Sequence, residues 1–509
     1  MVFNSLAFAI FLPTVLVIYY CLHYRAQTFL ILLASYFFYG WWDWRFLSLL
    51  WLSTVVDYIV GRLLDDPNAL DGAKHAPEDP EHAPPPAEPR PESSFTRLNR
   101  AVAHHRKIVL TVSVIANLAL LAVFKYFNFF VESADAVLQQ LGFHSSIETL
   151  WIILPVGISF FTFQSMSYTI DVYRGKIRAV KDPLNYAVFV AYFPQLVNGP
   201  IERADHMIRQ YDNPRVVDRD KIYSGLMLML IGFFKKIAIA DSVAPLVDEA
   251  FTAAQYGSWS LLYKGVCLFA IQIYCDFSGY TDIARGTSKL LGIELMENFQ
   301  QPYLSRNITE FWRRWHISLS TWLRDYLYIP LGGSRYGKFN TYRNLFLTML
   351  LGGLWHGANS TFIIWGGLHG LYLAIHKMML GEKKPVDEPW RPWHIVKLLV
   401  TLHLVLLAWI FFRPGPVRES FAYLKGILTL RGVGGAKFQL SAFSFMDAAT
   451  VAFFAGLVLL IDIPQYRRND HLAMLKWSWP MRGAVIALML LLLLIMGENN
   501  DIPFIYFQF

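Results

Sequence analysis

The sequence predicts an all-α, polytopic membrane protein, and three observations carry this prediction. Of the 509 residues, 55% are hydrophobic and 16% are charged, whereas soluble domains carry about 25% charged residues. Apolar runs long enough to cross a bilayer, which takes about 20 residues, recur along the chain. The net charge of +7 comes from lysine and arginine between these runs, which is typical of cytoplasmic loops and not of nucleic-acid binding. The composition excludes a disordered protein and an ordinary soluble enzyme.

The apolar runs predict roughly eleven transmembrane helices, with further re-entrant and interfacial amphipathic helices. A weaker stretch, 186–199, ends in Asn-Gly-Pro and is expected to enter the membrane and return. The apolar runs are 5–22, 28–40, 46–60, 108–131, 150–170, 223–240, 260–277, 345–354, 362–380, 395–412, 448–463 and 483–496.

We expect the chain to divide into four segments. Residues 1–64 form N-terminal transmembrane helices. Residues 65–106 are expected to form a disordered cytoplasmic loop, because their central part is rich in proline and acidic residues and has almost no large apolar side chain. Residues 107–394 form the core that carries the chemistry, and residues 395–509 form a C-terminal set of transmembrane helices.

Loop charges predict the orientation of the chain in the membrane. The loops 132–148 and 241–258 contain no lysine or arginine, whereas the loops 174–181 and 203–221 are basic. Because basic loops stay in the cytoplasm, we expect the N-terminus on the periplasmic side of a bacterial inner membrane. The basic loop 413–437 conflicts with this scheme, and it indicates either a miscounted helix or a basic partner-binding surface outside the membrane.

Residues 307–327 predict one amphipathic helix. Apolar side chains recur there at helical spacing, with arginines on the opposite face. Asn307 followed by Glu310 predicts a capping box at the start of this helix. His316 falls at the edge of the apolar stripe, where we expect it to face both the protein interior and a polar space. The alternative is a snorkelling side chain at the membrane interface.

His356 lies at a glycine-flanked break between apolar segments. The run 345–353 is too short to span a bilayer alone, and Trp355-His356-Gly357 follows it directly. An ionisable residue at such a break is a candidate functional residue, although a hydrogen-bonded structural histidine is the alternative. His369, inside the next run, is predicted to be a packed helix histidine.

Two carboxylates, Asp276 and Asp282, are placed by the sequence at the end of an apolar helix. Asp276 has two interpretations: it contacts substrate inside a membrane passage, or it forms a structural ion pair with Arg285 or Arg313. No metal site is predicted, because no set of His, Cys, Asp and Glu residues has the spacing of metal ligands.

Two motifs in this region are distinctive: FWRRWHISLSTWLRDY at 311–326 and GGLWHGAN at 352–359. With DFSGY at 276–280, DVYRG at 171–175 and NGP at 198–200, they resemble the membrane-bound O-acyltransferase (MBOAT) family. Within it, the chain is more similar to the branch that O-acetylates alginate than to the branch that transfers D-alanine. The proline-rich insert departs from the family pattern, and the tail after residue 395 matches it less specifically.

The resemblance implies an MBOAT fold around a central tunnel, with His316 and His356 facing the tunnel. It further implies an acyl donor substrate, acetyl-CoA, on the cytoplasmic side, with no bound cofactor. The acetyl group would pass to a secreted, alginate-like polysaccharide with the help of a periplasmic SGNH-type acetyltransferase partner.

A positioned imidazole suits this chemistry, because it can take the proton of a hydroxyl that is otherwise a weak nucleophile. We expect His356 to act as the general base, with Trp355 or Asn359 orienting it or holding the oxyanion. His316 is expected to position the thioester, stabilise developing charge or relay a proton. Asp276 completes the expected substrate contacts.

The sequence is also compatible with three rival functions. A second enzyme would move D-alanine from a carrier-protein thioester to a teichoic acid partner. A polysaccharide or lipid transporter would use polar residues at membrane depth to line a translocation path. A scaffold would only recruit periplasmic enzymes. Both non-enzymatic functions predict that replacing the two histidines leaves function intact.

Overall fold

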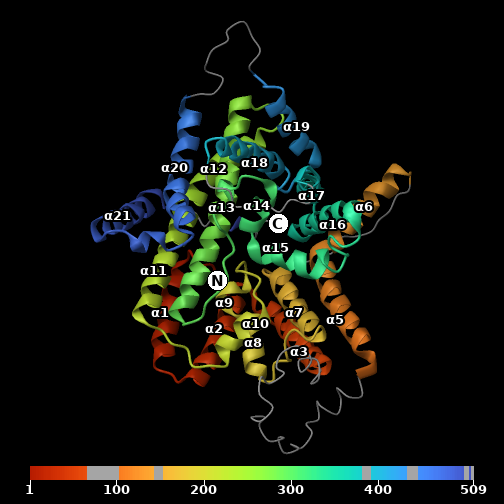
Figure 1. Cartoon of the computed structure of the whole chain (residues 1–509), viewed down its shortest axis with the longest axis vertical. Helices are drawn as coiled ribbons and strands as arrows, with labels where there is room; N and C mark the ends of the chain where they lie inside the picture. Colours follow the sequence, from red (N-terminus) through yellow and green to blue (C-terminus); the bar gives the residue numbers. More distant parts are fainter. Residues whose placement is uncertain (66–102, 143–152, 381–390, 433–444, 498–503, 506–509) are drawn as a thin grey trace, which may run out of the picture. The chain divides into compact units, whose positions relative to one another are not determined.

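The computed structural model describes residues 1–65, 103–142, 153–380, 391–432, 445–497 and 504–505, and it is all-helical in these ranges, with no β-strand (Figure 1). This confirms the predicted fold class. The predicted disordered loop, 65–106, lies almost entirely outside the described residues. Helical structure suits a protein in a membrane, because a helix satisfies its backbone hydrogen bonds within itself where no water is available.

The chain divides into two compact units, Met1–Val197 with Ile201–Val216, and Asn198–Pro200 with Val217–Phe509. The four sequence segments proposed above stay a prediction. The first unit contains α1 (Leu6–Tyr20), α2 (Tyr24–Asp43), η1 (Trp44–Phe46), α3 (Leu47–Leu64), η3 (Ala103–His105), α5 (Arg106–Leu121), η4 (Ala122–Tyr126), α6 (Phe127–Gln140), α7 (Ile158–Tyr173), α8 (Pro183–Ala191), α9 (Phe193–Leu196) and α10 (Ala204–Tyr211).

The first unit buries broken backbone inside protein. The stretch expected to re-enter the membrane contains two short helices, α8 and α9, and nearly all of its side chains are buried. The amide of Phe193, the first residue of α9, donates to the hydroxyl of Ser35 on α2 at 3.0 Å. Such coverage is the condition under which irregular backbone survives at membrane depth.

The second unit carries every predicted site residue. It contains α11 (Arg219–Phe233), η5 (Phe234–Asp241), α12 (Ser242–Thr252), α13 (Trp259–Leu290), η6 (Pro302–Leu304), α14 (Ile308–Arg314), α15 (Ile317–Leu323), η7 (Arg324–Tyr328), α16 (Gly337–His356), α17 (Ser360–Leu380), α18 (His394–Trp409), α19 (Val417–Leu428), α20 (Phe445–Arg468), η9 (Ala473–Lys476) and α21 (Trp479–Met496).

Two helices of this unit are longer than their apolar runs. Helix α13 has 32 residues, so Asp276 and Asp282 lie inside it and not at its end. Helix α16 has 20 residues, so the run 345–353 is the apolar half of a full-length helix. The placement of the two carboxylates at a helix end was wrong, because hydropathy marks only the apolar part of a helix. That the run 345–353 is too short to span a bilayer alone stays a prediction, since α16 is not among the described helices that are long and apolar enough to do so.

Glycines let the helices of this unit approach closely. A Cβ built on Gly232 of α11 would lie 2.6 Å from the Gly279 carbonyl oxygen of α13. A Cβ on Gly353 of α16 would lie 2.2 Å from the Phe362 carbonyl oxygen of α17, and 3.0 Å from Gly366 Cα. Small residues at contacts of this kind are typical of helix packing in membranes, where backbone proximity replaces the hydrophobic effect as a source of stability.

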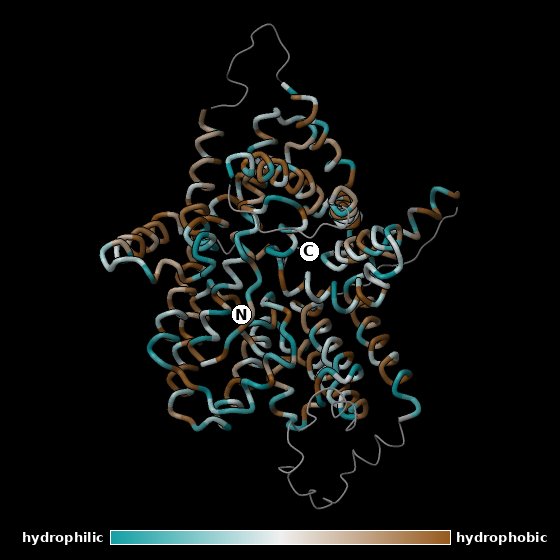
Figure 2. The backbone as a smooth tube through the Cα atoms, in the orientation of Figure 1, coloured by the Kyte–Doolittle hydropathy of each residue, from teal (hydrophilic) through white to brown (hydrophobic). Residues whose placement is uncertain are grey.

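The outward faces of several helices suit a lipid environment. Among the described residues, six helical stretches are long and apolar enough to cross a membrane, and α1 and α18 are shorter apolar helices. The predicted number of roughly eleven transmembrane helices therefore stays a prediction. Figure 2 shows α21 and α5 coloured as hydrophobic, and leucines of α21 such as Leu491 and Leu494 are exposed. A contiguous exposed apolar face of this kind indicates a surface that contacts the membrane.

Candidate active site

Helices α14 and α15 are separated by a break at Trp315 and His316. Asn307 caps the start of α14, because its Oδ1 accepts a hydrogen bond from the backbone N–H of Glu310 at 2.9 Å. Trp315 is extended, and His316 adopts the left-handed conformation with φ of 43°. The predicted continuous helix over 307–327 is therefore wrong, although its start and its cap are confirmed.

The loop before α14 supplies the hydrogen bonds that sustain this break. The Ile317 amide donates to the Asn298 carbonyl oxygen at 2.9 Å. Ser318 donates to Asn298 Oδ1 from its amide at 3.2 Å and from its hydroxyl at 2.9 Å. The Gln300 amide donates to the Arg314 carbonyl oxygen at 3.0 Å. The helical period of the sequence carries no signal of this support, because the partners come from another segment.

The break buries His316 completely. Its side chain is 0% exposed, and its ring packs edge-on against Phe277 of α13 with centroids 4.7 Å apart. The expectation that His316 faces a polar space is therefore wrong, because the break turns the side chain off the surface of the predicted helix. Burial lowers the pKa of the His316 imidazole to about 3, so the ring is neutral near pH 7.

A second break, after α16, positions His356. Helix α16 ends at His356, and α17 begins at Ser360, as the glycine-flanked sequence predicts. A Cβ on Gly357 would lie 2.3 Å from the Phe362 ring, so this close approach requires glycine. Asn359 Oδ1 accepts hydrogen bonds from the amide and the hydroxyl of Thr361, at 2.9 and 3.0 Å. Asn359 thus caps the start of α17.

The two predicted histidines lie next to each other. The ring centroids of His316 and His356 are 6.4 Å apart, and Trp355 lies 5.0 Å from His356 and 6.1 Å from His316. His356 is only 4% exposed, and its ring also packs against Trp365 at 5.1 Å and Phe412 at 5.0 Å. Two buried imidazoles with aromatic walls can hold or pass a proton in a site that limits access of water.

Asp276, the remaining predicted site residue, is held by an ion pair. Its Oδ1 lies 2.7 Å from Lys236 Nζ, and its Oδ2 accepts a hydrogen bond of 2.6 Å from the backbone N–H of Ile505. The ion pair considered from the sequence is therefore present, but its partner is Lys236 and not Arg285 or Arg313. The reason is that Lys236 faces α13 from the π-helical segment η5, which packs along it.

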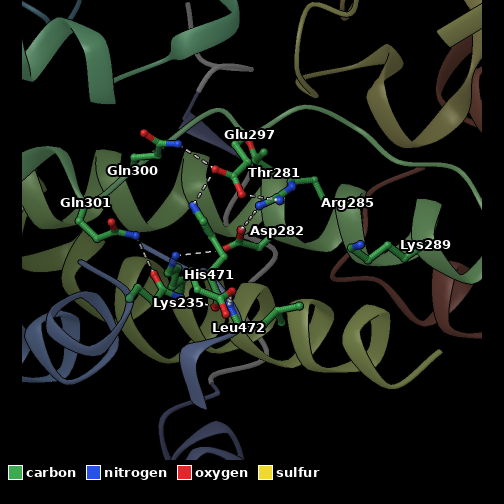
Figure 3. A network of polar contacts seen from close by, with 12 residues as sticks. Lys235, Thr281, Asp282, Arg285, Lys289, Glu297, Gln300, Gln301, His471 and Leu472 are labelled. Carbon is green, nitrogen blue, oxygen red and sulfur yellow. Dashed lines mark hydrogen bonds and ion pairs between the residues drawn. The ribbon is translucent and has the colours of Figure 1, made fainter. Parts of the chain in front are cut away.

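Sequence reasoning missed a buried polar network beside this pair (Figure 3). Lys235 Nζ lies 2.8 Å from Asp282 Oδ2, and Arg285 Nη2 lies 3.0 Å from Glu297 Oε1. His471 Nε2 lies 3.5 Å from Glu297 Oε2. Burial favours a higher pKa for the Glu297 carboxyl, but the charges of His471 and Arg285 outweigh burial and lower it. The missed signal was a pair of lysines inside an apolar run.

This network fixes the loop that supports the α14–α15 break. Glu297 directly precedes Asn298, whose carbonyl and side-chain oxygens hold the first residues of α15. The Gln300 side chain donates to Glu297 Oε2 at 2.9 Å, and Gln301 donates to Gln465 of α20 at 3.0 Å. The charges of the network therefore act on the site by positioning it.

The chemistry available at this site is acid–base chemistry on a bound substrate. A neutral imidazole accepts or donates a proton, and the neighbouring indoles are hydrogen-bond donors only. In the described parts of the chain, no group of three His, Cys, Asp or Glu side chains is arranged to hold a metal ion. The arrangement suits proton abstraction from a hydroxyl next to an acyl group.

Comparisons with known proteins identify the family of this chain. The model of the MBOAT, membrane-bound O-acyltransferase family, matches residues 177–382, which include both histidines. The probable alginate O-acetylase AlgI of Pseudomonas putida is 38% identical over 525 residues, covering 100% of both chains. The peptidoglycan O-acetyltransferase of Helicobacter pylori is 32% identical over 561 residues, covering 100% of this chain and 98% of that protein.

A teichoic acid D-alanyltransferase of Bacillus subtilis is more distant, at 28% identity over 278 residues, which are 51% of this chain and 69% of that protein. The full-length likeness to proteins above 30% identity, the family model and the apolar helices agree on one class of membrane enzyme. The chain is an O-acyltransferase that belongs to the membrane-bound O-acyltransferase family.

Proposed function

We propose that this membrane O-acetyltransferase takes an acetyl group from cytoplasmic acetyl-CoA and moves it across the bacterial inner membrane for O-acetylation of a secreted, alginate-like polysaccharide. Full-length likeness to an alginate O-acetylase and a peptidoglycan O-acetyltransferase supports acetyl as the cargo. The likeness to a D-alanyltransferase is weaker and covers half of the chain, so D-alanine is the second candidate for the transferred group.

The observation that carries this proposal is the pair of buried imidazoles at two backbone breaks. His316 and His356 come from separate helical segments, yet their ring centroids lie 6.4 Å apart. Burying two ionisable side chains costs folding free energy, so such residues usually mark a functional site. Breaks in membrane helices occur where the backbone is buried in protein or lines a cavity, as at a substrate site. Because the two side chains are only 0% and 4% exposed, the proposal requires a passage that opens to the pair from both sides of the membrane during transfer.

His356 acts as the general base in this mechanism. It takes the proton of the acceptor hydroxyl as the oxygen attacks the thioester carbonyl, and it returns the proton to the leaving sulfur. His316, kept neutral by burial, positions the thioester and relays protons. Trp355 touches both imidazoles and contacts the acyl group, while Asn359 and Asp276 line the substrate path from the start of α17 and from α13.

A periplasmic partner of the SGNH acetyltransferase type, similar to AlgJ or AlgX, completes the transfer. The basic loop that follows α18 is the proposed surface for that partner. Arg413 pairs with Asp248 at 2.5 Å, and its backbone oxygen accepts a hydrogen bond from Thr361 at 3.3 Å. Because Thr361 also binds Asn359 beside His356, a partner on this loop would lie close to the reacting groups.

The test compares His356→Ala and His356→Gln with His403→Gln, which removes an exposed histidine of α18 outside the site. Membranes that contain each variant are supplied with radiolabelled acetyl-CoA to measure acetyl transfer. The extracellular polymer of cells that carry each variant is analysed for ester-linked acetyl groups by mass spectrometry. We expect both His356 variants to lose activity by about 10²–10⁴-fold, the usual contribution of a general base. The His403 variant should remain active.

Other outcomes separate the rival functions. Transfer from a D-alanyl carrier protein, with none from acetyl-CoA, would identify D-alanine as the cargo. Unchanged polymer export and acetylation in inserted His356 variants would favour a transporter or a scaffold and would contradict the proposed mechanism.

A further inference from the structure

His369 of α17 lies in an aromatic cluster next to His356. Its ring centroid is 4.8 Å from Trp365, 5.1 Å from Trp312 and 6.0 Å from the parallel ring of Phe311. The side chain of His369 is 0% exposed, and Trp365 is 1% exposed. The sequence predicts a packed helix histidine here, but packing alone does not account for its polar atoms.

The hydrogen bond from Trp312 fixes the tautomer of His369. Trp312 Nε1 lies 3.2 Å from His369 Nδ1. An indole N–H is a donor only, so Nδ1 must be the accepting, unprotonated nitrogen. The single proton of the neutral ring is therefore on Nε2, which makes Nε2 a second donor inside the cluster.

Two buried donors in this cluster have no hydrogen-bond acceptor among the described residues. They are His369 Nε2 and Trp365 Nε1. Burying a donor without a partner is costly, and buried groups of this kind indicate an acceptor that arrives with a ligand. By contrast, the indole of Trp409 in the same cluster donates to the Tyr303 hydroxyl at 3.2 Å.

The ring of Trp365, which carries one of the two donors, contacts both His369 and the proposed general base, His356. Its centroid lies 5.1 Å from His356, with the two rings perpendicular, and 4.8 Å from His369. An acceptor bound by Trp365 Nε1 is thus within one ring of the imidazole that takes the proton. Donors next to a base are the arrangement that stabilises the oxyanion of an acyl transfer.

We propose that Trp365 Nε1–H and His369 Nε2–H form a binding site for the carbonyl oxygen of the acyl group during transfer. This inference rests on the proposed function, because it names the subsite that the acyl carbonyl occupies. The acyl donor is a thioester and the acceptor is an alcohol. Both donors are uncharged, so they favour the developing negative charge on oxygen without attracting anions to the resting enzyme.

In the proposed step, the acceptor alcohol replaces the thiol at the acyl carbon. The alcohol oxygen bonds to the carbonyl carbon while its proton moves to His356, and the carbonyl π pair moves onto the oxygen held by the two N–H groups. The oxygen pair then re-forms the C=O bond, the C–S bond breaks, and the sulfur leaves with the bonding pair. The leaving sulfur takes the proton from His356, which gives an ester and a thiol.

Matched variants of the full chain in detergent test this site, with acetyl-CoA as the donor probe. Trp365→Phe removes the indole N–H but keeps an aromatic ring, and Trp409→Phe is the control in the same cluster. For His369, glutamine places an amide N–H near the position of Nε2, whereas asparagine reaches only the position of Nδ1. The measurements are kcat and KM for thioester consumption and the melting temperature of each variant.

We expect Trp365→Phe to lower kcat by about 10²-fold or more with little change in KM, which is the usual effect of losing one oxyanion donor. His369→Asn should lower kcat similarly, and His369→Gln should restore part of it. Trp409→Phe should lower the melting temperature and leave kcat close to that of the unmodified protein.

Three results would overturn the inference: kcat of Trp365→Phe equal to that of Trp409→Phe, equal losses for the two His369 variants, or losses that follow the melting temperature alone. If Trp365→Phe does not fold, the His369 pair decides the question. Failure of the proposed function looks different, because the unmodified protein would then not use acetyl-CoA and His356→Gln would change nothing. An active protein that needs His356 but not Trp365 would refute only the donor pair.

Discussion

Burial, and not a charged neighbour, sets the protonation state of His316. Desolvation lowers the pKa of its imidazole to about 3 in the folded protein, and the ordinary value is 6.5. A neutral ring accepts a proton and does not repel an incoming cation. The left-handed backbone at His316 is unusual for a residue other than glycine, and a residue held in such a conformation by its surroundings is often part of a functional site.

This pKa predicts how stability depends on pH. Between about pH 3 and 6.5, the unfolded chain binds a proton at His316 that the folded protein does not bind. Stability therefore rises with pH across this window and is lost as the pH falls through it. We expect the melting temperature in detergent to fall between pH 7 and pH 5, and to fall less in His316→Asn. Asparagine suits the control because it does not titrate and tolerates the left-handed conformation.

If His316→Asn showed the same loss between pH 7 and pH 5 as the unmodified protein, the buried neutral ring would not be the source of the pH dependence. The measurement needs no activity, so it is independent of the proposed reaction.

The residues of the site differ in how far the sequence could predict them. His356 was predicted because glycines mark its break, and an ionisable residue at a break is expensive at membrane depth. His316 was identified through its motif, but its burial was not, because no glycine or proline marks the turn at Trp315. The partner of Asp276 was missed because no pattern along α13 reveals which side chain on another helix meets it.

At the scale of elements, one asparagine links the upstream loop to α15. Asn298 accepts two hydrogen bonds from Ser318 through its side chain and one from Ile317 through its backbone. The side-chain oxygen satisfies the free amide of Ser318 at the start of the helix, in the way an N-cap residue does. The α14–α15 break therefore depends on a residue outside both helices.

Asn298→Ala should destabilise the protein by about 1–3 kcal/mol, because it leaves the buried amide of Ser318 without its acceptor. Ser318→Ala removes only the hydroxyl donor and should cost less, about 0.5–1.5 kcal/mol. Unfolding in detergent measures both costs, and kcat measures the displacement of His316. Equal costs for the two variants, or full kcat in Asn298→Ala, would show that the loop does not position this histidine.

The α16–α17 pair depends on a glycine contact that hydropathy did not reveal. Helix α16 was predicted only in its apolar half, yet its last residues carry His356 and its Gly353 touches α17. The break between the helices was predictable from Gly357, whereas the closeness of the helices is a property of packing. In Figure 1 the two helices lie side by side, and this pair forms one wall of the site.

Gly353→Ala should separate these helices. Its Cβ would lie 2.2 Å from the Phe362 carbonyl oxygen, which is backbone and cannot move alone. Overpacking of this kind costs about 1–3 kcal/mol, and it should also lower kcat because His356 follows three residues later. The control is Gly456→Ala in α20, where a Cβ meets nothing within 4 Å.

At the control position we expect no loss, and a gain of up to about 1 kcal/mol from helix propensity. Thermal unfolding in detergent and acetyl-CoA turnover report both variants. A Gly353→Ala protein as stable and as active as Gly456→Ala would show that α16 and α17 do not need this contact.

At the scale of the whole molecule, the fold class followed from composition and the family from motifs, but the number of spans did not. Charge patterning along the loops gave an orientation with one conflict, the basic loop that begins at Arg413. In the structure, that loop lies against the acidic segment 241–258. Arg413 pairs with Asp248, and Arg431 donates to the Ala254 carbonyl oxygen at 3.0 Å. Two segments in contact share one side of a membrane, so this loop lies on the same side as the segment 241–258, and its conflict with the positive-inside pattern remains.

The orientation can be tested on a single helical stretch of the second unit, Arg219–Thr252, which is long enough to cross the membrane. In a chain whose exposed Cys21 is changed to serine, single cysteines replace Arg219 before this stretch and Gln255 after it, both exposed positions. Basic residues precede the stretch and are absent after it, so its start is expected in the cytoplasm. A membrane-impermeant thiol reagent should label Gln255→Cys in cells with a permeable outer membrane, and Arg219→Cys only after the inner membrane is opened. The reverse pattern would place the loop that follows α18 on the cytoplasmic side, away from any periplasmic partner.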